Sequence, residues 1–141
     1  MPLPQDGLVE RIAGLAPSTI DGFLKGSIDL VFTDEAGRYH LLDWKTNRLG
    51  DSDDDYTPEA VDTAMLHSAY PLQCLLYACA LHRHLAFRLG SAYDPARHLG
   101  HAHYLFVRGM STAAPGRAVW NRPLDPTLIQ HLCDKLFPHP C

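Results

Sequence analysis

The fold class is decided by two stretches, FLKGSIDLVFT at residues 23–33 and RYHLLDWKT at residues 38–46. Both are rich in β-branched, aromatic and leucine side chains, a composition that favours strands. Between them, residues 34–37 read DEAG, and acidic residues followed by glycine are typical of a tight turn. We therefore expect the two stretches to pair as an antiparallel β-hairpin.

Helix and strand patterns continue through the rest of the chain. After an acidic loop over residues 47–56, Thr57 and Pro58 provide a capping hydroxyl and a proline suited to a first helical turn, which predicts a helix to about residue 68. The remaining predicted elements are a long helix at residues 70–90, a strand at 101–108 and a closing helix at 126–137. This order predicts an α/β fold with a mixed sheet flanked by helices.

The long helix is expected to bury one face. Helical spacing predicts a core-facing stripe made of Leu72, Leu75, Leu76 and Cys79. The helix is expected to end near Gly90, because a residue without a side chain suits a helix C-terminus.

Length and composition limit the functions to consider. The chain has 141 residues, 46% apolar and 20% charged, which fits a single domain over residues 1–141 with a weakly structured lead-in at 1–22. No apolar stretch approaches the ~20 residues that span a bilayer, and the N-terminus lacks the order of a signal peptide, so we expect a cytoplasmic protein with no membrane partner. The net charge of -4 argues against binding nucleic acid through overall charge, but it leaves open a site where a metal ion supplies positive charge.

The cysteines do not form a metal-binding pattern. None of the four, Cys74, Cys79, Cys133 and Cys141, belongs to a CxxC pair. A zinc ribbon or an iron–sulfur centre is therefore disfavoured, and we expect free, mostly buried thiols.

Three charged residues occupy strand positions where apolar residues are expected. Asp43 and Lys45 flank Trp44, and alternation along a strand places the two charged side chains on one face and Trp44 on the other. If the hairpin pairs through its turn, Asp29 lies beside Asp43 on the same face. The spacing is also compatible with a structural Asp–Lys pair and an unrelated aspartate at the strand edge.

Two neighbouring carboxylates suggest a divalent cation. Burying such charges separately would cost several kcal/mol each, and an ion between them removes that cost. Oxygen ligands in this number suit Mg²⁺, which keeps waters and accepts phosphate oxygens in its remaining positions. Lys45 would then orient or help deprotonate an attacking water and stabilise negative charge on phosphorus.

A wider arrangement resembles a known family. Gly26-x-x-Asp29, a hairpin, Asp43-x-Lys45, and Gln73-x-x-x-Tyr77 on a following helix resemble the ordered motifs of the PD-(D/E)XK nuclease superfamily. The stretches GSIDLVF, YHLLDWKTNRLG, YPLQCLLYACALHRHL and HYLFVRGM are similar to RecB-type nuclease domains. The match runs over about residues 24–110.

The resemblance implies a fold, an activity and a site. The fold would be restriction-endonuclease-like, and the activity would be Mg²⁺-dependent exonucleolytic and endonucleolytic cleavage of DNA within a RecBCD-like helicase–nuclease for double-strand break repair and recombination. Its implied partners are DNA, RecC-like and RecD-like subunits and the helicase part of its own subunit. The implied catalytic residues are Asp29, Asp43, Lys45, Gln73 and Tyr77, and the implied metal ligands are Asp29, Asp43 and the Trp44 carbonyl.

One part of the family pattern is not matched. RecB-type domains carry a further ligand, a histidine or acid, on a helix upstream of the first strand, whereas here only Asp6, Glu10 and Asp21 precede Asp29 as acids, with a weak helical stretch near residues 8–15. No GxxxxGK[ST] motif is present, so ATP-driven unwinding is not encoded. We therefore expect part of a larger subunit, with an incomplete site, a partly uncovered apolar sheet face that favours self-association, and weak or no nuclease activity of the isolated chain.

A non-catalytic role is the main alternative. A module of nuclease fold could dock helicase partners or DNA without cutting. A docking module would not need Asp29, Asp43, Lys45, Gln73 and Tyr77 together, and their joint presence favours a nuclease.

The histidines do not complete a zinc motif. His101 and His103 are expected to share one face of the third strand, with His98 nearby, but neither cysteine nor carboxylate completes a zinc spacing. We expect structural or surface roles for them. Tyr104 and Phe106 on the same strand are expected to lie in the core.

Overall fold

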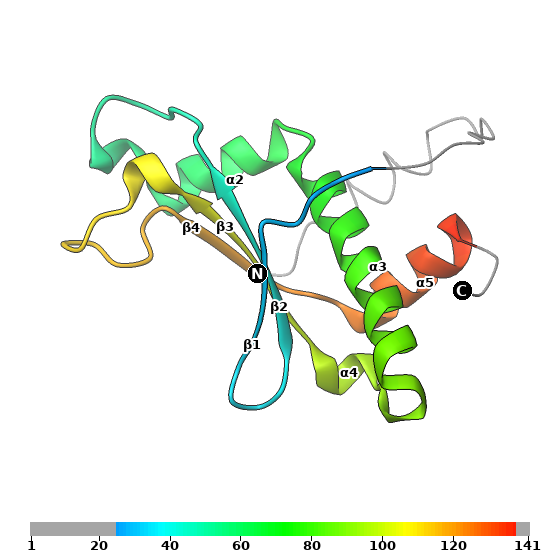
Figure 1. Cartoon of the computed structure of the whole chain (residues 1–141). Coiled ribbons are helices and arrows are strands. Elements are labelled where there is room, and N and C mark those ends of the chain that lie inside the picture. Colours follow the sequence, from blue (N-terminus) through cyan, green and yellow to red (C-terminus); the bar gives the residue numbers. More distant parts are fainter. Residues whose placement is uncertain (1–24, 138–141) are drawn as a thin grey trace.

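The computed structural model describes residues 25–137 and contains one mixed sheet with helices (Figure 1). The elements are β1 (Leu30–Thr33), β2 (Tyr39–Lys45), η1 (Asp53–Asp55), α2 (Pro58–Leu66), α3 (Tyr70–Leu89), η2 (Gly90–Ala92), α4 (Pro95–His98), β3 (Leu99–Phe106), η3 (Val107–Gly109), β4 (Val119–Pro123) and α5 (Pro126–Leu136). The strand order is β1-β2-β3-β4; β2 and β3 are parallel and the other pairs are antiparallel. The predicted α/β class with a mixed sheet is confirmed, whereas the predicted lead-in at 1–22 lies outside the described residues.

The hairpin forms through the predicted turn. The Asp34 carboxylate accepts hydrogen bonds from the backbone N–H groups of Ala36 and Arg38. Gly37 has a φ of 77°, a conformation that favours glycine. These contacts fix the register, in which Leu30 pairs with Leu42 and β1 runs antiparallel to β2.

The first strand is shorter than predicted. It begins at Leu30 rather than at residue 23, so Asp29 lies just before the strand and not within it. The segment before the strand lies against α3 instead: a Cβ atom added at Gly26 would be 3.1 Å from the Tyr77 ring. This segment therefore passes close to the helix before it joins the sheet edge.

The two central helices begin and end close to the predicted positions. Thr57 caps α2 by accepting a hydrogen bond from the Ala60 N–H, and Pro58 occupies the first turn. The long helix α3 ends at Leu89, and Gly90 follows with a φ of 53°. The capping residues identified in the sequence thus mark both ends correctly.

The predicted core stripe of α3 is partly wrong. Leu75 and Cys79 are buried, but Leu72 is 42% exposed and Leu76 is only half-buried. The residues of α3 that are buried are Cys74, Leu75, Ala78, Cys79, Leu81 and Leu85. The helix contacts both the sheet and α5, so small residues that permit close approach, rather than the leucines alone, define its buried face.

A fourth strand was not predicted. β4 pairs antiparallel with β3 and places Trp120 in the core beside Tyr104. Its five residues VWNRP end in proline and include only two apolar side chains besides it, a weak strand pattern that suits a sheet edge. The following helix α5 is capped by Asp125 and begins within the predicted range.

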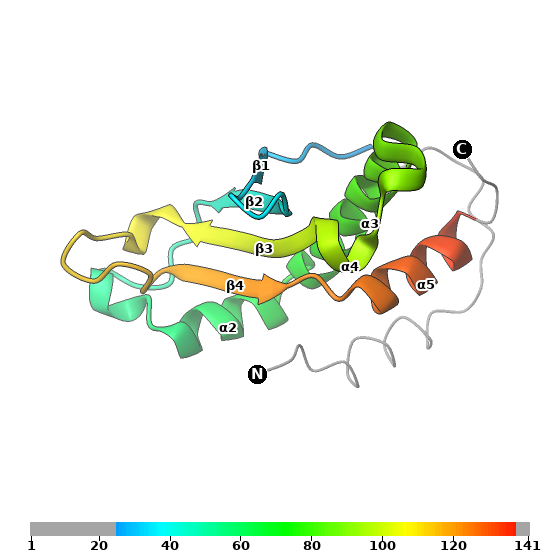
Figure 2. The same cartoon turned by 90° about the horizontal axis from the view of Figure 1, so that it is seen from below.

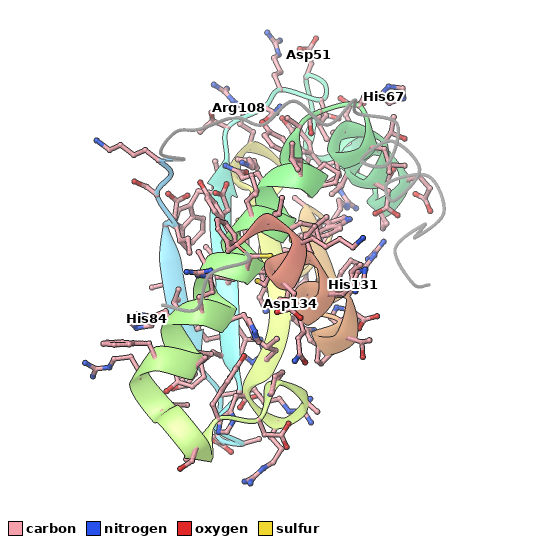
Figure 3. The ribbon with its side chains drawn as sticks, turned by 90° about the vertical axis from the view of Figure 1, so that its right-hand side faces the viewer. Asp51, His67, His84, Arg108, His131 and Asp134 are labelled. Atoms are coloured by element: carbon pink, nitrogen blue, oxygen red, sulfur yellow. The ribbon has the colours of Figure 1, made fainter. Side chains whose placement is uncertain are left out.

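The helices α3 and α5 lie on one side of the sheet. Figure 1 shows both to the right of the strands, Figure 2 shows the same arrangement from below, and in Figure 3 they lie in front of the strands. On the opposite face, the apolar side chains of Leu30, Phe32 and Trp44 are exposed in the described part of the chain. Within residues 25–137, no helix is long and apolar enough to cross a membrane.

Candidate active site

Asp43 and Lys45 form a buried ion pair on β2. Their side chains point to the helix-covered face, where Asp43 is 6% exposed and Lys45 is 7% exposed. The Lys45 Nζ atom lies 2.6 Å from Asp43 Oδ2. Trp44 points to the other face and is 47% exposed, so the predicted alternation along this strand is confirmed.

The Lys45 ammonium is held by α3 as well as by Asp43. It donates a hydrogen bond of 2.9 Å to Gln73 Oε1, and the Gln73 amide nitrogen donates to the Tyr77 hydroxyl at 3.1 Å. Gln73 and Tyr77 lie one helical turn apart and therefore point the same way. The structure thus brings together four of the five predicted catalytic residues across the β2–α3 contact.

Burial of this ion pair requires its additional hydrogen bonds. A buried charge pair is stable only when the remaining donors and acceptors are also satisfied. Among the described residues, every buried side-chain nitrogen and oxygen atom has a hydrogen-bond partner. Gln73 supplies such a partner to Lys45, which gives a polar residue on the sheet-facing side of α3 a physical reason to be there.

Asp29 approaches the same strand end from β1. Its Oδ2 atom accepts a hydrogen bond of 2.9 Å from the Trp44 backbone N–H. In the hairpin, Leu30 pairs with Leu42. If this register is continued by one residue, Asp29 lies opposite Asp43. Directly opposed residues share a face of a sheet, although Asp29 itself is exposed and precedes the strand.

The donor atoms at this strand end suit a hard divalent cation. In a strand, the N–H and C=O groups of one residue point toward the same neighbouring strand. Because the Trp44 N–H donates to Asp29, the Trp44 carbonyl faces the same side of β2 as Asp29. Two carboxylates and one carbonyl leave coordination positions for water and phosphate oxygens, as Mg²⁺ prefers. Within residues 25–137, no three histidine, cysteine, aspartate or glutamate side chains are grouped so that they could hold a metal ion by themselves.

Two buried groups near the ion pair, Cys74 and Tyr104, stay neutral. Burial raises the pKa of Cys74 to about 12. Burial also raises the pKa of Tyr104 well above its ordinary value, and the nearby Cys74 and Asp43 add to this effect. Neither group carries a charge at neutral pH, so the charged groups of the buried site are Asp43 and Lys45.

Sequence reasoning missed the two tyrosine rings, of Tyr70 and Tyr104, that lie next to Lys45. The Lys45 Nζ atom lies 3.8 Å from the centroid of the Tyr70 ring and 5.0 Å from that of Tyr104. Tyr104 was expected only to fill the core, and Tyr70 only to begin a helix. The available signal was the spacing Tyr70-x-x-Gln73, which places both side chains on one helix face.

Other polar residues are used elsewhere. His40, His101 and His103 contact one another on the opposite face of the sheet, consistent with the structural or surface roles expected of His101 and His103. Asn121 from β4 hydrogen-bonds with both His101 and His103. The upstream acids, including Glu10, lie outside the described residues.

This geometry agrees with the family to which the chain belongs. The chain is a member of the PD-(D/E)XK nuclease superfamily, whose family model matches residues 7–135. The class defined by the fold and site is therefore that of a nuclease domain.

Within that class, the chain is similar to proteins named RecBCD enzyme subunit RecB. It is 50% identical over 132 residues to the RecB subunit of Mycobacterium tuberculosis (strain H37Rv), covering 88% of this chain. It is 50% identical over 127 residues to that of Mycolicibacterium smegmatis and 43% identical over 118 residues to that of Escherichia coli K12. The chain spans about 12% of the length of the first of these relatives, 11% of the second and 10% of the third.

Proposed function

We propose that the chain hydrolyses phosphodiester bonds in DNA as a Mg²⁺-dependent exodeoxyribonuclease domain. The observation that supports this most strongly is the buried Asp43–Lys45 pair, hydrogen-bonded to Gln73 at the end of a parallel strand. A pair that served stability alone would gain little over apolar residues of similar volume, because desolvation offsets much of its attraction. In a catalytic site, by contrast, the carboxylate would bind the metal ion and the ammonium would stabilise negative charge on the phosphate.

In this proposal Asp29, Asp43 and the Trp44 carbonyl hold the ion. When bound, a divalent cation supplies Lewis acidity that polarises the scissile phosphate and makes a water more acidic. Lys45, fixed beside Asp43, orients that water and stabilises negative charge that develops on the phosphate oxygens. Gln73 and Tyr77 keep the ammonium in place and offer polar contacts to the DNA backbone.

The larger assembly is inferred from the relatives. We propose that the chain belongs to a RecBCD-like helicase–nuclease that acts in the cytoplasm in double-strand break repair and recombination. Its partners would be DNA, the helicase part of its own subunit, and RecC-like and RecD-like subunits. The names of the relatives support this assignment.

A cleavage assay with end-labelled linear duplex DNA tests the activity. In the presence of Mg²⁺, the wild-type chain should shorten the DNA slowly, in keeping with the weak activity expected of the isolated chain, and Asp43→Ala should abolish shortening because it removes a metal ligand. Lys45→Ala should lower the rate by at least about 100-fold, a typical contribution of a positioned acid–base group. Asp62→Ala is the control and should cleave DNA at the wild-type rate. It removes only the ion pair between Asp62 of α2 and Arg122 of β4.

The outcomes separate the two classes of function. Equal cleavage by the wild-type chain and Asp43→Ala would contradict the proposed site. DNA binding without any cleavage, both by this chain and by one extended at its N-terminus, would instead support the non-catalytic docking module.

A further inference from the structure

We propose that Tyr70 is a positioning residue that holds the Lys45 ammonium through the face of its aromatic ring. This inference rests on the proposed nuclease function, because it assigns a role within that site. The role is distinct from those of Asp43 and Gln73, which contact Lys45 through oxygen atoms.

The geometry is that of a cation–π contact in a buried site. The Lys45 Nζ atom lies 3.8 Å from the Tyr70 ring centroid, well inside the ~6 Å within which such contacts are attractive. Lys45 is 7% exposed, so little water competes for the ammonium. Tyr104 lies farther from Nζ, at 5.0 Å, and its ring packs beside Tyr70 with centroids 6.1 Å apart.

The Tyr70 ring is itself fixed at both ends. Tyr70 is the first residue of α3, and Pro71 follows it in the first turn. Its hydroxyl donates a hydrogen bond of 2.8 Å to Asn47 Oδ1, and Asn47 follows Lys45 by two positions. The tyrosine therefore ties the start of α3 to the chain that leaves β2, with Lys45 between them.

The ring matters most when Asp43 has another partner. In this structure Asp43 is the nearest acceptor of the Lys45 ammonium. A cation on Asp43 would weaken the attraction between Asp43 and Lys45, since the carboxylate charge would be shared. The contacts to Tyr70 and Gln73 do not depend on that carboxylate, so they keep the ammonium beside the reacting phosphate.

A purely structural role for Tyr70 predicts different behaviour. Leucine would preserve apolar packing at the start of α3 but would remove the π face. Phenylalanine would preserve the π face but would remove the hydrogen bond to Asn47. The two substitutions therefore separate the ring from the hydroxyl.

The first readout is NMR of the whole chain with ¹³C-labelled lysine. The chain has three lysines, Lys25, Lys45 and Lys135, so Lys45→Ala assigns the signal and the other two serve as references. Protons above a ring face are shifted upfield by the ring current. We expect the Lys45 ε-protons to be shifted upfield in the wild-type chain and in Tyr70→Phe, and to lose much of this shift in Tyr70→Leu, where only the more distant Tyr104 ring remains.

The second readout is the kinetics of DNA cleavage. Tyr70→Leu should lower kcat by about tenfold with little change in KM, while Tyr70→Phe should retain most of the activity. Tyr93→Leu is the matched control, because Tyr93 is also half-buried but its ring contacts those of His82 and His98 instead of Lys45. It should leave both the Lys45 shift and kcat unchanged.

Three results would overturn the proposal. They are an unshifted Lys45 signal in the wild-type chain, equal losses of kcat in Tyr70→Phe and Tyr70→Leu, and a normal kcat in Tyr70→Leu despite a lost shift. A lack of DNA cleavage both by this chain and by one extended at its N-terminus would contradict the proposed function, while the NMR comparison would still decide whether Tyr70 holds Lys45.

Discussion

Gln73 shows how a single side chain can make a buried charge tolerable. Its carbonyl oxygen accepts from the Lys45 ammonium at 2.9 Å, and its amide nitrogen donates to Tyr77. A neutral residue suits this position because it adds an acceptor without adding a second negative charge beside Asp43. Removal of the acceptor would leave part of a buried ammonium without a partner, which is expensive in free energy.

We predict that Gln73→Leu lowers the free energy of unfolding by about 1–3 kcal/mol, because it leaves Lys45 under-bonded. Urea unfolding measures this change. Gln130→Leu, at an exposed position of α5, is the matched control and should stay within about 0.5 kcal/mol of the wild-type value. Equal effects of the two substitutions would show that the Gln73–Lys45 hydrogen bond contributes nothing to stability.

The residue types of the site were predictable, but its aromatic surroundings were not. Charged residues within an apolar strand pattern pointed to Asp43 and Lys45, because burial of a charge needs a special reason. The closeness of Tyr70 and Tyr104 to Lys45 depends on how α3 crosses the sheet. No local pattern encodes that crossing, since tyrosines in a core and tyrosines around a cation look alike in sequence.

At the scale of elements, α3 carries half of the site and α5 holds α3 in place. Cys79 of α3 and Ile129 and Cys133 of α5 are buried against one another, with the Cys133 thiol donating to the Cys79 carbonyl. The limits of α2 and α3 were predictable because threonine, proline and glycine mark them locally. The identity of the buried face of α3 was not, because it depends on two neighbouring elements at once.

We predict that Ile129→Ala destabilises the fold by about 3 kcal/mol, because it opens a cavity under α3. The measurement is again chemical unfolding, at constant pH. Leu136→Ala on the same helix removes a side chain that is 45% exposed and should cost much less. A loss for Leu136→Ala as large as that for Ile129→Ala would contradict the claim that α5 is held through Ile129.

At the scale of the whole molecule, the two faces of the sheet have different chemistry. The helix-covered face carries the buried ion pair. The other face carries exposed apolar side chains and the histidine group of His40, His101 and His103. Burial, with smaller contributions from His40 and His101, lowers the pKa of His103.

This pKa shift gives stability a defined pH dependence. The folded state binds a proton at His103 more weakly than the unfolded state does, so stability is complete above the unfolded pKa of about 6.5 and falls as pH drops below it. The lowered pKa of His82, caused mainly by burial, acts in the same direction as that of His103.

We predict that His103→Gln loses less stability than the wild-type chain between about pH 7.5 and about pH 5.5. Unfolding in urea at several pH values provides the measurement. His84→Gln is the control, since His84 is exposed on α3. A wild-type pH dependence in His103→Gln would assign the effect to other groups.

The central claim is that one ion site uses Asp43 as a ligand and Lys45 as a catalytic group. Calorimetric titration of the chain with Mn²⁺ tests it most directly, in the wild-type protein, Asp43→Ala and Lys45→Ala. We predict that Asp43→Ala largely abolishes binding, whereas Lys45→Ala binds at least as tightly, because it removes the ammonium that lies 2.6 Å from the ligand oxygen. Unchanged affinity in Asp43→Ala would place the ion elsewhere, for example at the acidic loop of residues 51–55, and would contradict the account.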